Sequence, residues 1–156
     1  MEERQPSSRM CFLCGRQNPV GLKITWVNDR EARQIRARVV VPEPFNGYPG
    51  VVHGGIVAAI LDETAGRAVL LDGDAENLMV TVKLEVRYRK PTPTGVPLVA
   101  VGWVIQQAES RARAASELRL EDGAVTAECE ALLFRPGQEF FDRWEPEKKY
   151  WRVYED

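Results

Sequence analysis

The chain has 156 residues, of which 44% are hydrophobic and 28% are charged, as is typical of one globular domain with a sizeable core. Its net charge of −2 at pH 7 excludes a strongly basic surface for nucleic acid, and no apolar stretch is long enough for a membrane-spanning helix. The charged N-terminus and the three cysteines predict a cytoplasmic protein with reduced thiols and no signal peptide.

The chain begins with a polar segment, residues 1–10, that we expect to be a loose tail. CFLCGRQNPVGL, from Cys11 to Leu22, follows and is rich in turn-forming residues. Its Cys-x-x-Cys spacing alone does not predict zinc, because a structural site needs four ligands and the chain has no second such pair. A redox pair is disfavoured because the next element is predicted to be a strand. A zinc site shared by two chains stays open, but we favour two apolar thiols in a packed turn.

Two strands are predicted before the central part of the chain. Residues 22–27 form the first strand, and Asn28-Asp29-Arg30 form the turn after it. Residues 34–41 form the second strand, in which apolar residues alternate with polar ones, as expected for a half-buried strand. Pro42 and Pro44 end it.

The stretch FNGYPGVVHGGIVAAILDETAGRA, from Phe45 to Ala68, contains the only histidine of the chain, His53. We expect a helix to follow this histidine, from about residue 54 to about residue 71, and to be closed by Asp72-Gly73-Asp74. Because the helix is apolar on nearly every side, it should be buried.

Two adjacent carboxylates, Asp62 and Glu63, interrupt this apolar helix. Glu63 has a partner in Arg67, four residues later on the same face. Asp62 has no such partner, since the residues three and four positions away are all small. One interpretation is a capped core helix with a solvated kink at Asp62. The other is a substrate cavity with an acid in its wall, because an uncompensated buried carboxylate is otherwise costly.

Four more strands are predicted after the helix, over residues 79–90, 97–106, 111–121 and 124–135. In the first of them, strict alternation places Val80, Val82, Leu84, Val86 and Tyr88 on one side, and Thr81 with the charged residues on the other. Gly102 indicates a bulge in the next strand. Glu121-Asp122-Gly123 predicts a hairpin turn.

The order of two strands, one helix and four strands predicts an α+β fold, in which a six-stranded antiparallel sheet wraps around one long central helix. We assign this domain to residues 1–135. Residues 136–156 are too aromatic for a disordered tail, so we expect an extension that packs on the domain or on a partner, partly as a short helix. The free edges of such a sheet favour pairing with a second copy.

Three segments resemble the hotdog-fold thioesterases, and most closely their PaaI-like branch: CFLCGRQNPVGL, GYPGVVHGGIVAAILDE and VTVKLEVRYRKPTPTG. The resemblance implies an acyl-CoA thioesterase that needs no metal or organic cofactor. It also implies a homodimer, or a homotetramer built as a dimer of dimers, with active sites between subunits. Beyond Pro136 the resemblance ends.

The resemblance implies roles for individual residues. Asp62 is expected to act as a general base toward water or as a nucleophile on the thioester carbonyl. The backbone N–H of Gly54 or Gly55 is expected to polarise that carbonyl, as suits the unsatisfied donors at a helix start. Thr81 would help to orient the attacking water. His53 would orient the loop, polarise the thioester or cap the helix.

Further residues are candidates for substrate binding. Glu63 lies beside Asp62. Arg89 and Lys90, with Arg87 and two arginines of a later strand, are candidates for the phosphates of coenzyme A. Asn46 lies seven residues before His53, whereas many PaaI-like enzymes use an Asn six residues before the His, so the loop departs from that pattern.

Two other functions fit the same segments. A hotdog hydratase or dehydratase would pair His53 with Glu63 as catalytic histidine and acid. A non-catalytic acyl-CoA-binding protein would keep the groove, while Asp62 served only the structure. The three functions differ in product: free thiol, hydrated acyl-CoA, or binding without turnover.

Overall fold

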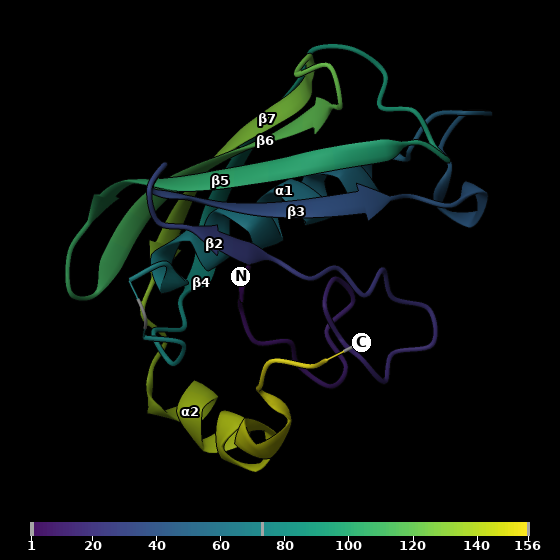
Figure 1. The fold of residues 1–156 in the computed structure, drawn as a ribbon. Helices are drawn as coiled ribbons and strands as arrows, with labels where there is room; N and C mark the ends of the chain where they lie inside the picture. Colours follow the sequence, from purple (N-terminus) through teal and green to yellow (C-terminus); the bar gives the residue numbers. More distant parts are fainter. Residues whose placement is uncertain (1, 73, 156) are drawn as a thin grey trace.

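A long helix, α1, lies against the inner face of a curved antiparallel sheet in the computed structural model, which describes residues 2–72 and 74–155 (Figure 1). The seven strands of the sheet are arranged in the order β1-β2-β3-β5-β6-β7-β4. The strands are β1 (Glu3–Arg4), β2 (Val27–Asp29), β3 (Gln34–Val40), β4 (Val80–Tyr88), β5 (Pro97–Gln107), β6 (Arg111–Leu120) and β7 (Val125–Phe134). The helical segments are η1 (Glu43–Phe45), α1 (Gly54–Arg67), η2 (Ala68–Leu70), α2 (Gln138–Trp144) and η3 (Glu145–Tyr150). The predicted α+β architecture is confirmed, with seven strands in place of six.

The additional strand, β1, comes from the segment predicted to be a loose tail, and it pairs with β2. Two polar side chains that follow β1, Gln5 and Ser7, are only 3% and 2% exposed. The side-chain nitrogen Nε2 of Gln5 donates a hydrogen bond to the backbone oxygen of Arg67, which compensates the burial of the Gln5 side chain. The prediction of a loose tail is therefore wrong for these residues.

β2 begins where the predicted first strand ends. Lys23 adopts a positive φ of 51°, which interrupts an extended strand. The N–H groups of Leu22 and Ile24 bond to carbonyl groups of the turn that contains Cys11 and Cys14, instead of to a strand. The predicted turn is also displaced, because residues 28 and 29 belong to β2.

α1 packs on the sheet through one face only. Val57, Ile60 and Leu61 are buried beneath the sheet, whereas Ala58 and Asp62 on the other side are half-buried. The predicted burial of the helix is therefore correct for one face only. An uncovered stripe of mostly small residues runs along the helix instead.

The regular α-helix ends at Arg67 and continues as the short helix η2, so it stops before the residues predicted to close it. Of those residues, Asp72 pairs with Arg33, and Gly73 lies outside the described residues.

The sheet approaches α1 closely at Gly102. An added Cβ at this position would lie 2.7 Å from the backbone oxygen of Thr64, so glycine is required there. Thr64 is held in turn by Trp26, whose indole Nε1 donates to its hydroxyl at 3.1 Å. The bulge predicted at Gly102 is wrong: the register between β5 and β6 shifts three residues later, at Ile105.

β4 contains a bulge at Val82. Thr81 and Lys83 pair with consecutive residues of β7, so Val82 between them has no partner in that strand and is 56% exposed. As a result, Thr81 faces α1 on the same side as Leu84. The predicted strict alternation is therefore wrong at Thr81 and Val82.

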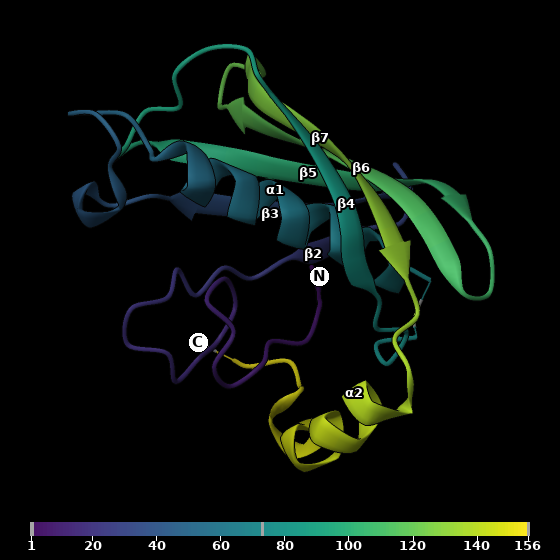
Figure 2. The same cartoon turned by 180° about the vertical axis from the view of Figure 1, so that it is seen from behind.

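The two ends of the chain lie together on the side of α1 that the sheet leaves uncovered (Figure 2). Ser7 and Arg152 form an antiparallel bridge. Trp151 donates a hydrogen bond of 2.7 Å from its indole nitrogen to the backbone oxygen of Ala75. These contacts fix α2 and η3 beneath α1.

Candidate active site

Two cavities open along the uncovered stripe of α1. The first, of about 440 Å³, lies beside Asp62, Glu63 and Thr81, and we name it the Asp62 cavity. The second, of about 650 Å³, lies at the start of the helix beside His53 and Gly54, and we name it the His53 cavity. Most of the site residues predicted from the sequence divide between the two, whereas Asn46 and Gly55 line neither.

Thr81 provides the partner that Asp62 lacks within its own helix. The Thr81 hydroxyl donates a hydrogen bond of 2.6 Å to Asp62 Oδ1. The bulge at Val82 makes this contact by turning Thr81 toward α1. The other carboxylate oxygen, Oδ2, has no protein donor within residues 2–72 and 74–155, so it is free to bind water or substrate.

Glu63 forms the predicted ion pair with Arg67, with 2.9 Å between Oε1 and Nε. The Arg67 side chain is only 4% exposed. Its guanidinium carbon lies 4.6 Å from the ring centre of Trp26 and 5.3 Å from that of Trp151. Burial raises the pKa of the Glu63 carboxyl, and the charge of Arg67 opposes this effect. Glu63 is thus fixed in the wall of the cavity.

Cys11 and Cys14 form another part of the same wall. The Cys11 thiol beside it, together with the Arg67 cation, lowers the pKa of Cys14 to about 5. The same sulfur pairing and burial raise the pKa of Cys11. Cys14 is buried and Cys11 is half-buried, and the N–H of Ser8 donates a hydrogen bond of 3.4 Å to Cys14 Sγ.

His53 caps the start of α1. Its Nδ1 accepts a hydrogen bond of 2.9 Å from the N–H of Gly55, as an N-cap side chain does. The Gly55 N–H is therefore occupied. The N–H of Gly54 has no acceptor among the described residues, and Gly54 lines the His53 cavity. Of the two donors that the sequence leaves open, Gly54 is the one free to bind a carbonyl oxygen.

Arg89 and Lys90 also line the His53 cavity. Arg89 donates a hydrogen bond of 2.6 Å to Glu128 Oε1 and remains about half exposed. Arg87 and Arg113 lie instead on the outer face of the sheet. Arg89 and Lys90 are thus the predicted cations that reach this cavity.

Asn46 lines neither cavity. It forms a bridge with Val52 behind the loop. Its Oδ1 is buried without a hydrogen-bond partner among the described residues. Its role in substrate binding stays a prediction.

The two groups of residues lie at opposite ends of the stripe. Asp62 follows Gly54 by eight residues, which corresponds to about 12 Å along a helix axis. A carbonyl under attack at Asp62 needs its oxygen within about 3 Å of the stabilising N–H. One chain therefore does not bring Asp62 and Gly54 into one site. His53 and Glu63 are also separated along the helix, so one chain does not bring them together as a catalytic pair.

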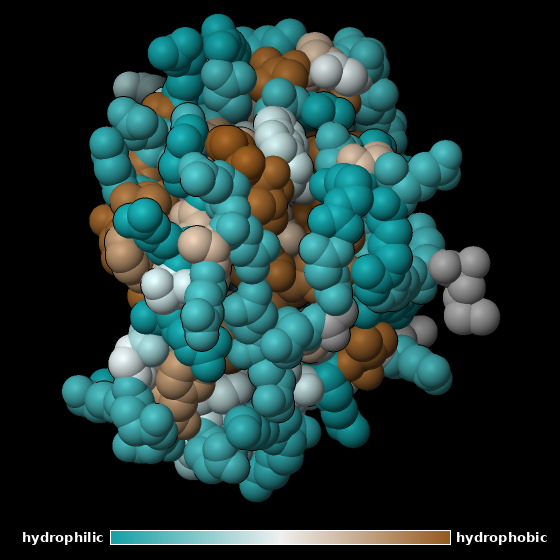
Figure 3. Space-filling view, turned by 90° about the vertical axis from the view of Figure 1, so that its left-hand side faces the viewer, coloured by the Kyte–Doolittle hydropathy of each residue, from teal (hydrophilic) through white to brown (hydrophobic). Residues whose placement is uncertain are grey.

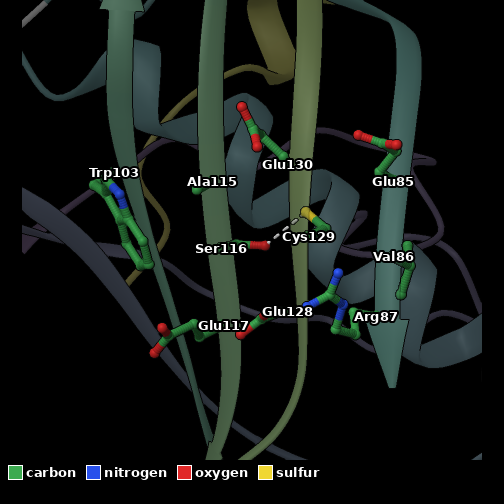
Figure 4. Close-up of a pocket in the computed structure, with 10 residues that line it drawn as sticks. All are labelled: Glu85, Val86, Arg87, Trp103, Ala115, Ser116, Glu117, Glu128, Cys129 and Glu130. Atoms are coloured by element: carbon green, nitrogen blue, oxygen red, sulfur yellow. Dashed lines mark hydrogen bonds between the residues drawn. The ribbon is translucent and has the colours of Figure 1, made fainter. Parts of the chain in front are cut away.

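A third cavity, of about 510 Å³, lies on the face of the sheet opposite to α1 (Figure 4). Its acidic residues are Glu85, Glu117, Glu128 and Glu130. Arg87 is the only cation among its described lining residues. Three of these carboxylates form ion pairs: Glu117 with Arg119, Glu128 with Arg89, and Glu130 with Arg113. Apart from Arg87, none of the site residues predicted from the sequence lines this cavity.

Sequence reasoning missed two parts of the site. Tyr88 donates a hydrogen bond of 2.6 Å from its hydroxyl to the backbone oxygen of Gly54, which attaches β4 to the helix start. Phe140, Trp144 and Trp151 of the C-terminal segment line the Asp62 cavity. Their aromatic character indicates packing, but no feature of the sequence shows which cavity they reach.

Comparisons with known proteins agree with this architecture. A family model described as the thioesterase superfamily matches residues 49–127, about half of the chain. The acyl-coenzyme A thioesterase THEM4 of Rattus norvegicus is 28% identical over 110 residues, which are 70% of this chain and 46% of the relative. The chain therefore spans about half the length of this relative.

Two solved structures extend the comparison. Protein RHA08564, a thioesterase superfamily protein, aligns with a TM-score of 0.74 and 28% identity over 81% of this chain and 61% of its own. The PaaI protein of E. coli aligns with a TM-score of 0.64 and 17% identity over 74% of this chain and 81% of its own. The predicted hotdog fold is confirmed. Within residues 2–72 and 74–155, no helix has the length and apolar character needed to cross a membrane.

Proposed function

Because the chain belongs to the thioesterase superfamily, we propose that it hydrolyses the thioester of an acyl- or aryl-coenzyme A to the free acid and coenzyme A. The observation that carries the proposal is the hydrogen bond from Thr81 to Asp62 in the wall of a cavity. A carboxylate held in this way can accept a proton from water as a general base, or attack the thioester carbonyl itself. The thiolate of coenzyme A leaves readily, so no strong general acid is needed.

The attack places negative charge on the carbonyl oxygen. The free N–H of Gly54 at the positive end of the α1 dipole would stabilise that charge. His53 supports this donor indirectly, since it caps the helix through Gly55. Collapse of the tetrahedral intermediate then breaks the carbon–sulfur bond and releases the thiol.

We also propose that the active unit is a homodimer or a homotetramer, in which Asp62 of one subunit meets Gly54 of the partner subunit. The two groups lie about 12 Å apart along one helix, which is too far for one thioester. A twofold axis between two antiparallel copies of α1 would place the start of one helix beside the middle of the other. Ala58 and Gly66 leave room for such an approach along the stripe.

In this arrangement coenzyme A would enter through the His53 cavity. Arg89 and Lys90 at its rim supply positive charge for the phosphates. We place the catalytic domain in residues 1–135, and we assign residues 136–156 to an extension whose aromatic residues line one side of the Asp62 cavity.

The test is hydrolysis of a panel of short, long and aromatic acyl-CoA thioesters, followed directly by the loss of thioester absorbance. We compare the wild type with Asp62→Asn, and with Asp142→Asn on the exposed side of α2 as a matched control. We expect Asp62→Asn to lower kcat at least about 100-fold with an unchanged circular dichroism spectrum, and Asp142→Asn to behave as the wild type.

Wild-type turnover by a well-folded Asp62→Asn variant would remove Asp62 from the mechanism. A wild-type protein that binds acyl-CoA and hydrolyses no member of the panel would instead be a binding protein.

A further inference from the structure

Three side chains with metal-ligating atoms meet in one wall of the Asp62 cavity. The sulfurs of Cys11 and Cys14 and a carboxylate oxygen of Glu63 all lie within 4.8 Å of one another, and all three residues line the cavity. Zinc binds sulfur at about 2.3 Å and carboxylate oxygen at about 2.1 Å, so neighbouring ligand atoms in a tetrahedral site lie roughly 3.6 to 3.8 Å apart. The observed cluster is compatible with this spacing after small side-chain movements.

The turn that carries the two cysteines provides hydrogen bonds to both sulfurs. The N–H of Leu13 donates to Cys11 Sγ at 3.3 Å, and the N–H of Ser8 donates to Cys14 Sγ at 3.4 Å. Gly15 closes the turn, and a Cβ there would lie 2.4 Å from the backbone oxygen of Cys11. Metal-bound thiolates characteristically accept hydrogen bonds from a surrounding shell of this kind.

α1 contributes the third side chain, and Arg67 fixes its orientation. Glu63 Oε1 accepts the hydrogen bond from Arg67 Nε at 2.9 Å, which leaves Oε2 available to a cation. Ligating carboxylates in metal sites commonly have such a second partner.

The formal charges of the cluster also favour a divalent cation. Metal binding displaces the protons of both thiols, so that two thiolates and the carboxylate of Glu63 then carry three negative charges, and Arg67 carries one positive charge. A divalent cation cancels the remaining two negative charges. This balance matters because Cys14 and Arg67 are almost fully buried, at 1% and 4% exposed, where net charge is costly.

We propose that Cys11, Cys14 and Glu63 bind one zinc-like divalent cation per chain. Thiolate ligands select a soft or borderline metal such as zinc over magnesium or calcium. The cation would tie the N-terminal turn to α1, and its fourth position would be filled by water from the cavity. The sequence alone does not predict zinc within one chain, because a structural site needs four ligands and the chain has no second pair of cysteines or histidines. The fold adds the third.

The test measures metal content rather than turnover, so it is independent of the proposed function. The full chain is purified under reducing conditions without a metal-affinity step, its zinc is quantified, and the metal-free protein is titrated with Co²⁺. We expect one metal ion per chain and a thiolate-to-cobalt charge-transfer band in the near ultraviolet. Cys14→Ser should abolish the band, and Glu63→Gln should weaken cobalt binding at least about tenfold.

Cys129→Ser is the matched control, because Cys129 is a free, buried cysteine outside the cluster. It should bind cobalt as the wild type does. If Cys14→Ser does not fold, the cobalt affinity of Glu63→Gln tests the site instead, since glutamine keeps the shape of the glutamate side chain.

Three results would overturn the proposal. One is a reduced wild-type protein that binds neither zinc nor cobalt. Another is a folded, reduced Cys14→Ser variant that binds cobalt with the stoichiometry and the charge-transfer band of the wild type. The third is half a metal ion per chain with an affinity that Glu63→Gln leaves unchanged, which would indicate a site made of four cysteines from two chains.

Discussion

The two oxygens of the Asp62 carboxylate have different surroundings. Asp62 lines the cavity. Its Oδ1 accepts the hydrogen bond from Thr81, and Oδ2 has no protein donor among the described residues. A carboxylate held through one oxygen presents the other in a defined direction, as proton abstraction from a bound water requires. We therefore propose Thr81 as a positioning residue that acts through Asp62.

Replacing Thr81 with Val keeps the shape of the side chain and removes the hydroxyl. We expect Thr81→Val to lower kcat about ten- to a hundredfold, because a loosened Asp62 spends less time in the reactive orientation. KM should change less, and Thr81→Ser should restore most of the activity. Steady-state kinetics on one acyl-CoA check this prediction, and a Val variant with the kcat of the wild type would contradict it.

Thr81 also shows why the orientation of a single side chain is not predictable from the sequence. The family resemblance indicates a role for Thr81 in orienting the attacking water, whereas strict alternation turns it away from α1. The bulge at Val82 removes the conflict. A bulge depends on how two strands pair, so the period of one strand does not reveal it.

At the scale of elements, the C-terminal segment forms one side of the Asp62 cavity. Trp144 of α2 and Trp151 after η3 both line it, and their rings meet edge to face with 5.6 Å between centres. These large rings restrict the room beside Asp62. The segment therefore sets the size of acyl group that the cavity accepts, provided that the proposed reaction takes place there.

Trp144→Ala would enlarge the cavity beside Asp62. We expect the variant to favour long acyl chains: kcat/KM for a long acyl-CoA divided by kcat/KM for a short one should rise about tenfold. A change in apolar contact between an acyl chain and its pocket typically has an effect of about this size. Phe141→Ala is the matched control, since Phe141 lies on the same helix and does not line this cavity. An equal shift in both variants would assign the effect to loosening of α2.

The helix and strands between Gln34 and Phe134 are predictable from the sequence, whereas β1, β2 and the position of the C-terminal helix are not. α1 and the strands β3 to β7 follow from local periodicity, glycines and prolines, to within a few residues at their ends. β1 and β2 depend on contacts with distant segments, such as Gln5 with Arg67 and Ser7 with Arg152. Helix in the C-terminal segment could be predicted, but its place beneath α1 depends on the same long-range contacts.

At the scale of the whole molecule, β4 leaves apolar residues exposed at one edge of the sheet. β4 pairs only with β7 among the described strands, and Val82 and Tyr88 are 56% and 52% exposed. On one face of the molecule, hydrophobic residues gather in a band between hydrophilic ones (Figure 3). An apolar strand edge beside the uncovered stripe of α1 is what a pairing surface for a second copy needs.

A shared active site predicts that two inactive variants complement each other. Asp62→Asn removes the carboxylate. Gly54→Pro removes the proposed N–H donor at a helix position where proline is tolerated, and the extended backbone of His53 before it, with ψ at 136°, suits a following proline. If Asp62 of one subunit works with Gly54 of the partner subunit, a mixed dimer contains one intact site and one site with both defects.

We expect each variant alone to be nearly inactive as a folded dimer. After unfolding and refolding together in equal amounts, about half of the dimers are mixed, so about a quarter of the wild-type kcat should return. Light scattering establishes the mass, and wild type refolded in the same way sets the reference. Subunits that exchange without any recovery would place the complete site within one chain, and a monomeric wild type with full turnover would exclude the shared site altogether.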